Sequence, residues 1–131
     1  MSGETDLANL LSNMSPILLE PEYIFYTSKT ADIALYMHLD PLAYFVEREG
    51  VSLIIDKDSA DQAGFEYEAV LKCITLQIHS SLEAVGLTAA VATKLAEYDI
   101  SANVVAAYYH DHVFVPVSKA ENAMRLLSQL S

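Results

Sequence analysis

Two histidines, His110 and His112, are the residues of this chain whose types and spacing could support metal chemistry. They alternate along an expected strand, so both side chains would lie on one face and could ligate the same ion. A third ligand would have to come from His79, His38 or a carboxylate, and nothing in the sequence places one beside them. Packing of both histidines against the neighbouring tyrosines at a hairpin tip accounts better for the pair. We therefore expect no metal site.

Other candidates for catalysis are few. Cys73 is the single cysteine, so no internal disulfide can form. In the middle of an expected strand it is typical of a small buried hydrophobic residue rather than a nucleophile. The chain contains no nucleophile elbow, phosphate-binding loop, pair of acid–base carboxylates or dinucleotide-binding fingerprint. We expect no catalytic residue and no cofactor, and infer that the protein is not an enzyme.

The composition is that of a folded, acidic protein. Of its 131 residues 53% are hydrophobic, which suffices for one domain of ordinary size or two very small ones. Seven basic residues against 18 acidic ones give a net charge of −11, which argues against a nucleic-acid partner. No apolar run approaches the ~20 residues of a membrane span, and no signal peptide opens the chain. We expect a soluble, cytoplasmic protein without membrane contact.

The periodicity of the second half predicts a strand, a helix, a hairpin of two strands and a second helix. Val70–His79 alternates, with Ile74, Leu76 and Ile78 on one face. The first helix has an apolar stripe at Leu87, Val91, Leu95 and Tyr98. Strands are expected within Ile100–Tyr109 and Val113–Val117, and Ser118–Glu121 has the form of a capping box. Behind it the apolar face of the last helix comprises Ala120, Ala123, Met124, Leu127 and Leu130.

The first half predicts shorter elements. A helix over residues 1–14 is capped by Thr5 and ends at Pro16, and Pro21 breaks the chain again. The remaining expected segments are an extended stretch, a strand, one or two helical turns, two strands and a short helix: Ser15–Leu19, Tyr23–Thr27, Ile33–Met37, Leu42–Glu47, Val51–Ile55 and Asp58–Gly64. Gly50 supplies a positive φ angle to the hairpin between the last two strands.

The two halves repeat one pattern. Leu53–Ala63 aligns with Val113–Ala123 at a shift of sixty positions, and in both a strand leads through an acidic first turn into helical alanines. The hairpin loops at residues 48–50 and 110–112 coincide under the same shift. We infer two βαββα units, of which the first has lost most of its first helix. Such sheets have edges that need partners, which predicts a homodimer.

Three motifs of the second half resemble the ACT domain. They are Val85–Ala90 (VGLTAA), Ile100–Ala106 (ISANVVA) and His110–Pro116 (HDHVFVP). ACT domains are ferredoxin-like βαββαβ modules that bind amino acids and regulate metabolic enzymes. The chain is similar to small prokaryotic proteins with two such modules and to the ACT units of the animal cytosolic arginine sensor. The resemblance is specific over residues 70–130 and reaches residues 15–66 through the repeat.

This resemblance implies an α+β fold of two tandem ferredoxin-like units, each an antiparallel sheet with helices on one face. We expect a degenerate unit with an N-terminal helix over residues 1–66 and an ACT domain over residues 67–131. The family pattern ends in a sixth element, a strand, whereas this sequence stops after a helix. That strand is either absent or supplied by the N-terminal segment, through Tyr23–Thr27 or Ser15–Leu19.

The resemblance also implies a ligand site in the loop between the first strand and first helix of the second unit. In ACT modules this loop borders the interface with a neighbouring module. Here it would offer hydroxyl and backbone N–H groups to a ligand carboxylate, and its residues are Ser80, Ser81, Leu82, Val85, Gly86 and Leu87. A plain helix cap, with Gly86 needed only for close packing, is the structural alternative.

Three polar residues further along the chain are also candidates for ligand contact. Ser101 and Asn103 share one strand face, and Asn103 could hydrogen-bond an α-amino or α-carboxyl group. Asp111 could pair with a ligand ammonium. The structural alternatives are an amide that stabilises an edge or turn, and an aspartate that bonds its own backbone in a tight hairpin.

Together these inferences predict a regulatory or sensor protein that binds an amino acid or similar small metabolite at an ACT–ACT interface. Ligand binding would order that interface and shift a pre-existing equilibrium. An alternative from another class is a ligand-free interaction module that docks on a metabolic enzyme through its sheet edges. A metal-dependent hydrolase or isomerase is the third possibility.

Overall fold

The computed structural model describes residues 6–30, 32–78 and 85–130. The chain forms two compact units, and only one of them is continuous in sequence. Unit 1 contains Met1–Glu20 and Lys72–Ser131, and unit 2 contains Pro21–Leu71. The N-terminal segment therefore packs with the C-terminal half of the chain. The division expected at residues 66 and 67 follows the repeat and stays a prediction.

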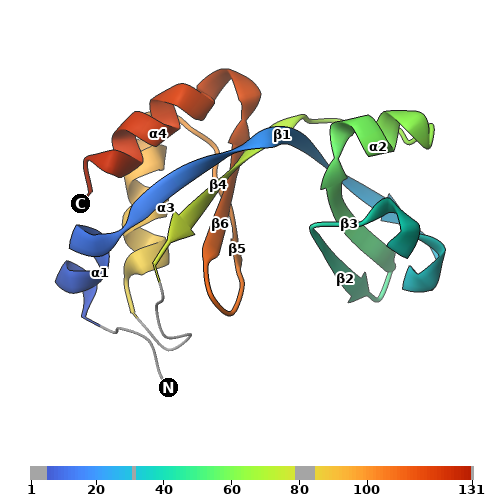
Figure 1. The fold of residues 1–131 in the computed structure, drawn as a ribbon, viewed down its shortest axis with the longest axis horizontal. Helices are drawn as coiled ribbons and strands as arrows, with labels where there is room; N and C mark the ends of the chain where they lie inside the picture. The colour runs from blue at the N-terminus through green and yellow to red at the C-terminus, as the bar shows by residue number, and fades with distance from the viewer. Residues whose placement is uncertain (1–5, 31, 79–84, 131) are drawn as a thin grey trace. The chain divides into compact units, whose positions relative to one another are not determined.

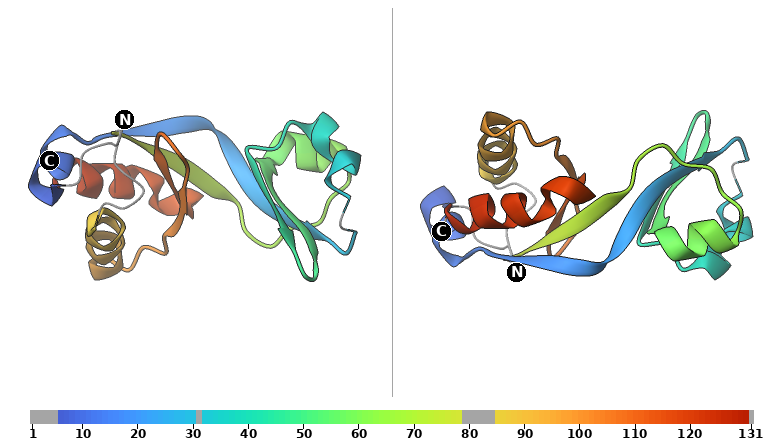
Figure 2. Two further views of the ribbon diagram at one scale, coloured as in Figure 1. Left: turned by 90° about the horizontal axis from the view of Figure 1, so that it is seen from below. Right: turned by 90° about the horizontal axis from the view of Figure 1, so that it is seen from above.

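Within its described residues, unit 1 combines four strands with three helices (Figure 1). Its strand order is β1–β4–β6–β5, and β1 (Ser15–Ser28) contributes residues 15–20 to this unit. The other strands and the helices are β4 (Leu71–Gln77), β5 (Asn103–Ala106), β6 (Asp111–Pro116), α1 (Leu7–Asn13), α3 (Leu87–Glu97) and α4 (Ala120–Ser128). The helices α3 and α4 lie side by side (Figure 2), and they share one core with a single face of these strands.

The N-terminal segment supplies the strand that completes unit 1. Residues 15–20 of β1 lie beside β4, where Nζ of Lys72 donates a hydrogen bond to the carbonyl oxygen of Glu20 at 2.6 Å. Of the two segments that the sequence offered for this place, Ser15–Leu19 occupies it. Tyr23–Thr27 lies in unit 2 instead, paired with β3.

The core of unit 1 lies between one face of its sheet and the helices. Alternation along β4 and β6 turns Ile74, Leu76, Val113 and Val115 toward this core. The helices α3 and α4 add Leu87, Val91, Leu95, Ala120, Ala123, Leu126 and Leu127. Leu10, in the middle of α1, and Met14, just after its end, are also buried in this core, so α1 is part of unit 1 rather than an appendage.

Unit 2 contains the first copy of the repeat. Its antiparallel strands are residues 23–28 of β1, β3 (Gly50–Asp56) and β2 (Ala43–Glu47). One short helix, α2 (Lys57–Gln62), follows β3. Two 3₁₀ turns, η1 (Ile33–Leu35) and η2 (Met37–Leu39), stand where a first helix is expected. The loss of most of that helix, predicted from the sequence, is confirmed.

Aromatic side chains fill the space in unit 2 that a longer helix would cover. The rings of Tyr26 and Phe65 stack with centroids 3.9 Å apart, and the Tyr36 ring meets both of them edge-on. The Tyr36 hydroxyl also lies 2.8 Å from Oγ of Ser28, which ties the 3₁₀ turns to β1. The buried cluster beneath consists of Ile24, Val51, Leu53, Ile55 and Ala60.

The two hairpins have the same strand register. In unit 2 Ala43 pairs with Ile54, and in unit 1 Asn103 pairs with Phe114, which is the same pair moved by sixty positions. The next pairs, Tyr44 with Leu53 and Val104 with Val113, also coincide. Because a slip of one residue would turn every side chain to the other face, this agreement supports the repeat independently of sequence identity.

Three expectations about helix ends and strand breaks are corrected. Thr5 lies outside the described residues, and Asp6 caps α1 by accepting hydrogen bonds from the N–H groups of Ala8 and Asn9. The capping box at Ser118–Glu121 is wrong, because a 3₁₀ turn over Val117–Lys119 delays the start of α4 and no side chain caps either helix. The expected break at Pro21 is wrong, because β1 is one continuous strand. Pro16 is its second residue, and Pro21 is the residue at which unit 2 begins.

The stripe of α3 also ends earlier than expected. Tyr98 is 48% exposed, because α3 stops at Glu97 and the backbone reverses at Asp99, which has a φ of 59°. In α4 the apolar face includes Leu126, which is fully buried and which the sequence pattern left out. No helix within the described part of the chain is long and apolar enough to span a bilayer.

Gly50 provides a test of the hairpin in unit 2. Its φ is +145°, and a Cβ at this position would lie 1.8 Å from the carbonyl oxygen of Ser28. We expect Gly50→Ala to lower the free energy of unfolding by roughly 3 kcal/mol, because backbone atoms must move. Gly64→Ala, with a positive φ but nothing within 4 Å, should lose only about 1 kcal/mol. Urea denaturation of both variants checks this, and equal losses would contradict the steric explanation.

Candidate ligand-binding site

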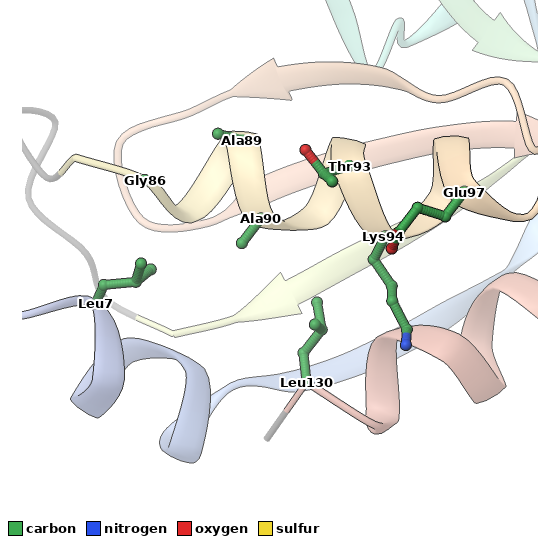
Figure 3. A pocket seen from close by; sticks show the side chains of 8 residues that line it. All are labelled: Leu7, Gly86, Ala89, Ala90, Thr93, Lys94, Glu97 and Leu130. Atoms are coloured by element: carbon green, nitrogen blue, oxygen red, sulfur yellow. The ribbon is translucent and has the colours of Figure 1, made fainter.

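A groove of about 400 Å³ lies along the outer side of α3 in unit 1 (Figure 3). Its apolar lining comes from α3 and from residues near both chain ends: Leu7, Gly86, Ala89, Ala90 and Leu130. Three polar residues, Thr93, Lys94 and Glu97, line it toward the end of the helix. Intervals of three and four residues place the α3 members on one stripe. The groove is shallow and open to solvent, and its lining is mostly apolar.

Gly86 closes one end of the groove. Its φ of 102° lies in the left-handed region, and a Cβ there would lie 3.1 Å from Cδ2 of Leu7. Glycine is therefore favoured both by the backbone conformation and by the close approach of α1. This geometry agrees with the alternative in which Gly86 is needed only for close packing. A role of Gly86 in ligand binding stays a prediction.

The opposite end of the groove carries two opposite charges. The Lys94 ammonium lies 5.4 Å from the centre of the Tyr98 ring, a cation–π contact that positions this charge without neutralising it. The exposed Glu97 lies one helical turn from Lys94. Neither side chain forms an ion pair with another described residue. Both charges are therefore available to a ligand.

The structure describes only some of the loop residues that the sequence predicts for ligand binding. Ser80, Ser81 and Leu82 lie outside the described residues. Val85 is 83% exposed, whereas Leu87 is buried in the core of unit 1. Among the nominated residues that are described, Gly86 is the one that lines the groove. The sequence did not predict the remaining groove residues, because alanines, polar residues on an exposed helix face and two leucines near the chain ends give no signal of a ligand site.

The polar residues of the second hairpin do not cluster around one point. Ser101 and Asn103 follow the C-terminal end of α3, whose 11 residues separate them from Gly86 by about 16 Å of helix. Asn103 pairs with Phe114 and Asp111 pairs with Ala106, so Asn103 and Asp111 lie at opposite ends of the paired segment. Their roles in ligand binding stay predictions.

The two histidines differ in their surroundings. His110 precedes β6, so the strand alternation assumed for the pair does not apply to it. Its Nδ1 is buried and has no hydrogen-bond partner in the described part of the chain. Nδ1 of His112 lies 3.0 Å from Oγ1 of Thr75, which links β6 to β4. Within the described ranges, no three His, Cys, Asp or Glu side chains are grouped so that they could hold a metal ion.

Burial dominates the titration of this region. Burial lowers the pKa of His112. The charge of His110 lowers this pKa further, whereas the charge of Asp111 raises it. Burial also raises the pKa of Asp111, against the opposing effect of both histidines. The thiol of Cys73 is fully buried, and burial raises its pKa to about 11. At neutral pH this thiol is therefore protonated, as expected of a structural cysteine.

The lowered pKa of His112 predicts a loss of stability on acidification. The folded state binds this proton less readily than the unfolded chain, whose histidines titrate near 6.5. The free energy of unfolding should therefore fall as the pH drops below about 6.5 toward the folded pKa. Asp111 acts in the opposite direction at lower pH, because its raised pKa lets the folded state bind a proton more readily.

His112→Gln should reduce this fall, since glutamine can still bond to Thr75 but does not titrate. Urea denaturation between about pH 5.5 and pH 7.5 measures the effect. The matched control is His38→Gln, which alters an exposed histidine of unit 2. Equal pH dependence in the His112 variant and the unmodified protein would contradict the prediction.

Comparison with known proteins identifies relatives of both halves of the chain. Models of the ACT domain match residues 2–72 and residues 68–129. A Vibrio cholerae protein of unknown function, described as a possible transport protein, is 49% identical to this chain. The match covers 95% of this chain and 94% of that one, with a TM-score of 0.86. No curated protein gave a match.

More distant structures share the fold. The ligand-free regulatory subunit of aspartate kinase from Thermus thermophilus is 12% identical over 89% of this chain and 95% of that one, with a TM-score of 0.60. Aspartate kinase from Clostridium acetobutylicum is 9% identical, with a TM-score of 0.63. That match covers 89% of this chain but 34% of the kinase.

Proposed function

Because the chain belongs to the ACT domain family and carries two such domains in tandem, we propose that it is a regulatory protein without catalytic activity. It binds an amino acid or a similar small metabolite at an ACT–ACT interface that forms when two chains pair in the cytoplasm. The observation that carries this proposal is the repeated hairpin, whose strand register is the same in both units. The shared register supports two related domains rather than one domain with an unrelated additional segment.

The start of α3 supports the location of the ligand. No side chain among the described residues caps this helix, whose N-cap position is Gly86. The N–H groups of its first turn therefore remain available to an acceptor such as a ligand carboxylate, which the helix dipole also favours. The loop Ser80–Gly86 leads directly into these groups, and its two serines add hydroxyl donors.

Ligand binding in this proposal acts by mass action. A ligand that binds the ordered loop and the paired chains better than the open forms shifts the population toward them. The same preference raises the melting temperature, because the ligand does not bind the unfolded chain.

A thermal-shift screen of the twenty amino acids tests the proposal. We expect a selective rise in melting temperature with one amino acid or a few of related structure, growing with ligand concentration. Replacing both Ser80 and Ser81 by alanine should reduce that rise. Ser118→Ala, at an exposed serine far along the chain, is the matched control and should leave it unchanged. An unchanged melting temperature with all twenty compounds would count against amino-acid sensing.

The edge strand β2 favours a second candidate function, that of an interaction module. It stands at the end of the strand order, and Tyr44, Phe45 and Val46 are 46%, 50% and 62% exposed. An exposed edge with apolar side chains readily pairs with a strand of another chain. We propose that β2 pairs two copies of this protein in a homodimer. A ligand-free module that docks on a metabolic enzyme would use the same edge.

Light scattering during gel filtration tests the role of β2. The unmodified chain should have twice its monomer mass of 14.4 kDa. Val46→Lys should give the monomer, because a charge on an edge strand opposes pairing. Leu35→Lys, which changes a 56% exposed residue elsewhere in unit 2, should leave the dimer intact. A monomeric unmodified protein, or a dimeric Val46→Lys variant, would exclude pairing through β2.

A further inference from the structure

The groove along α3 suggests a ligand site that extends from Gly86 along the helix and shares only this residue with the Ser80–Gly86 loop. We propose that it binds an α-amino acid with an aliphatic side chain, of which leucine is the representative. This inference rests on the proposed function, which it deepens by naming a ligand class and a place in unit 1. The observation that supports it is that apolar residues line one half of the groove, whereas Lys94 and Glu97 line the other.

The apolar half has room for a branched aliphatic side chain. Gly86 and Ala90 project little from α3, whereas Leu7 and Leu130 stand on the other side of the groove (Figure 3). The small residues leave space, and the two leucines supply apolar surface on which a ligand side chain can be buried. A ligand here would touch residues of α1 and α3 and Leu130, two residues after the end of α4, all within unit 1.

The charged half matches the head of an amino acid. The ammonium of Lys94 suits the ligand carboxylate, and the carboxylate of Glu97 suits the ligand ammonium. The two residues lie three positions apart on a helix, so their side chains are neighbours. The cation–π contact with Tyr98 holds the lysine ammonium in place before the ligand arrives, which reduces the ordering that binding requires.

The same division predicts selectivity. An acidic amino acid in this orientation would place its second carboxylate beside Leu7 and Leu130, whose side chains offer no donor, so that it would depend on the backbone N–H groups at the start of α3. Burial of an unpaired charge is strongly unfavourable, and the net charge of −11 adds repulsion. Aliphatic amino acids should therefore bind more tightly than aspartate or glutamate.

Calorimetric titration of the full chain with L-leucine and with 4-methylpentanoate tests the assignment. The second compound has the carbon skeleton and carboxylate of leucine but lacks its amino group. Lys94→Met should weaken binding of both compounds by about tenfold or more, because the charge is lost while the stem remains. Glu97→Gln should weaken binding of leucine and leave 4-methylpentanoate unaffected. Lys119→Met, which makes the same change outside the groove, should alter neither.

Ala90→Leu provides an independent test, because the larger side chain fills the apolar half of the groove. It should abolish leucine binding without a loss of the circular dichroism signal of the folded chain. Leucine binding that Lys94→Met, Glu97→Gln and Ala90→Leu all leave unchanged would overturn the groove assignment while amino-acid binding stands. Tighter binding of aspartate than of leucine would also overturn the groove assignment while amino-acid binding stands. Failure of every amino acid to bind would overturn both proposals.

Discussion

The pairing of residues 15–20 with β4 is the constraint on which unit 1 depends. Without this strand, the backbone of β4 would present one row of unpaired N–H and C=O groups. The same pairing determines where the preceding residues lie, so that Leu10 and Met14 enter the core beside α3 and α4. Leu7 then lies close to the start of α3, and this approach together with the φ of 102° disfavours a side chain at position 86. The groove along α3 is therefore a consequence of how the sheet is completed.

The two units show how one register can support different cores. Both hairpins pair in the same way, yet unit 1 covers its sheet with the aliphatic face of α3 and unit 2 uses two 3₁₀ turns with the aromatic rings of Tyr26, Tyr36 and Phe65. A stripe of small residues on a full helix is what makes the groove in unit 1. The 3₁₀ turns of unit 2 are too short to carry such a stripe.

Much of the strand and helix content could be predicted from the sequence, because alternation and helical spacing reflect burial directly. Ile74, Leu76, Val91 and Leu95 are buried as their periodicity indicated. The burial of Thr75 on the other face of β4 was not indicated, since alternation alone cannot show when both faces of a strand are covered. The sequence predicted breaks at Pro16 and Pro21, so the continuity of β1 was missed. A strand tolerates proline near its start, as at Pro16, and at a position where its pairing changes, as at Pro21.

The candidate site was harder to predict than the fold. Gly86 could be found because it belongs to the motif VGLTAA, through which the chain resembles the ACT domain. Lys94 and Glu97 could not, because charged residues on an exposed helix face are ordinary and their meaning depends on what lies opposite. The residues across the groove, Leu7 beside Gly86 and Leu130 nearer Lys94, are distant in sequence from α3 (Figure 3).

The discontinuity of unit 1 also bears on the order in which the protein acquires structure during translation. Its α1 and the first part of β1 are synthesised before unit 2, whereas β4 and α4, their partners in the core, are synthesised after it. Unit 2 is continuous in sequence and can fold while the second half is still being made. Until then Leu10 and Met14 remain in contact with solvent or with a chaperone. The closing of unit 1 is a long-range event, and such events slow folding.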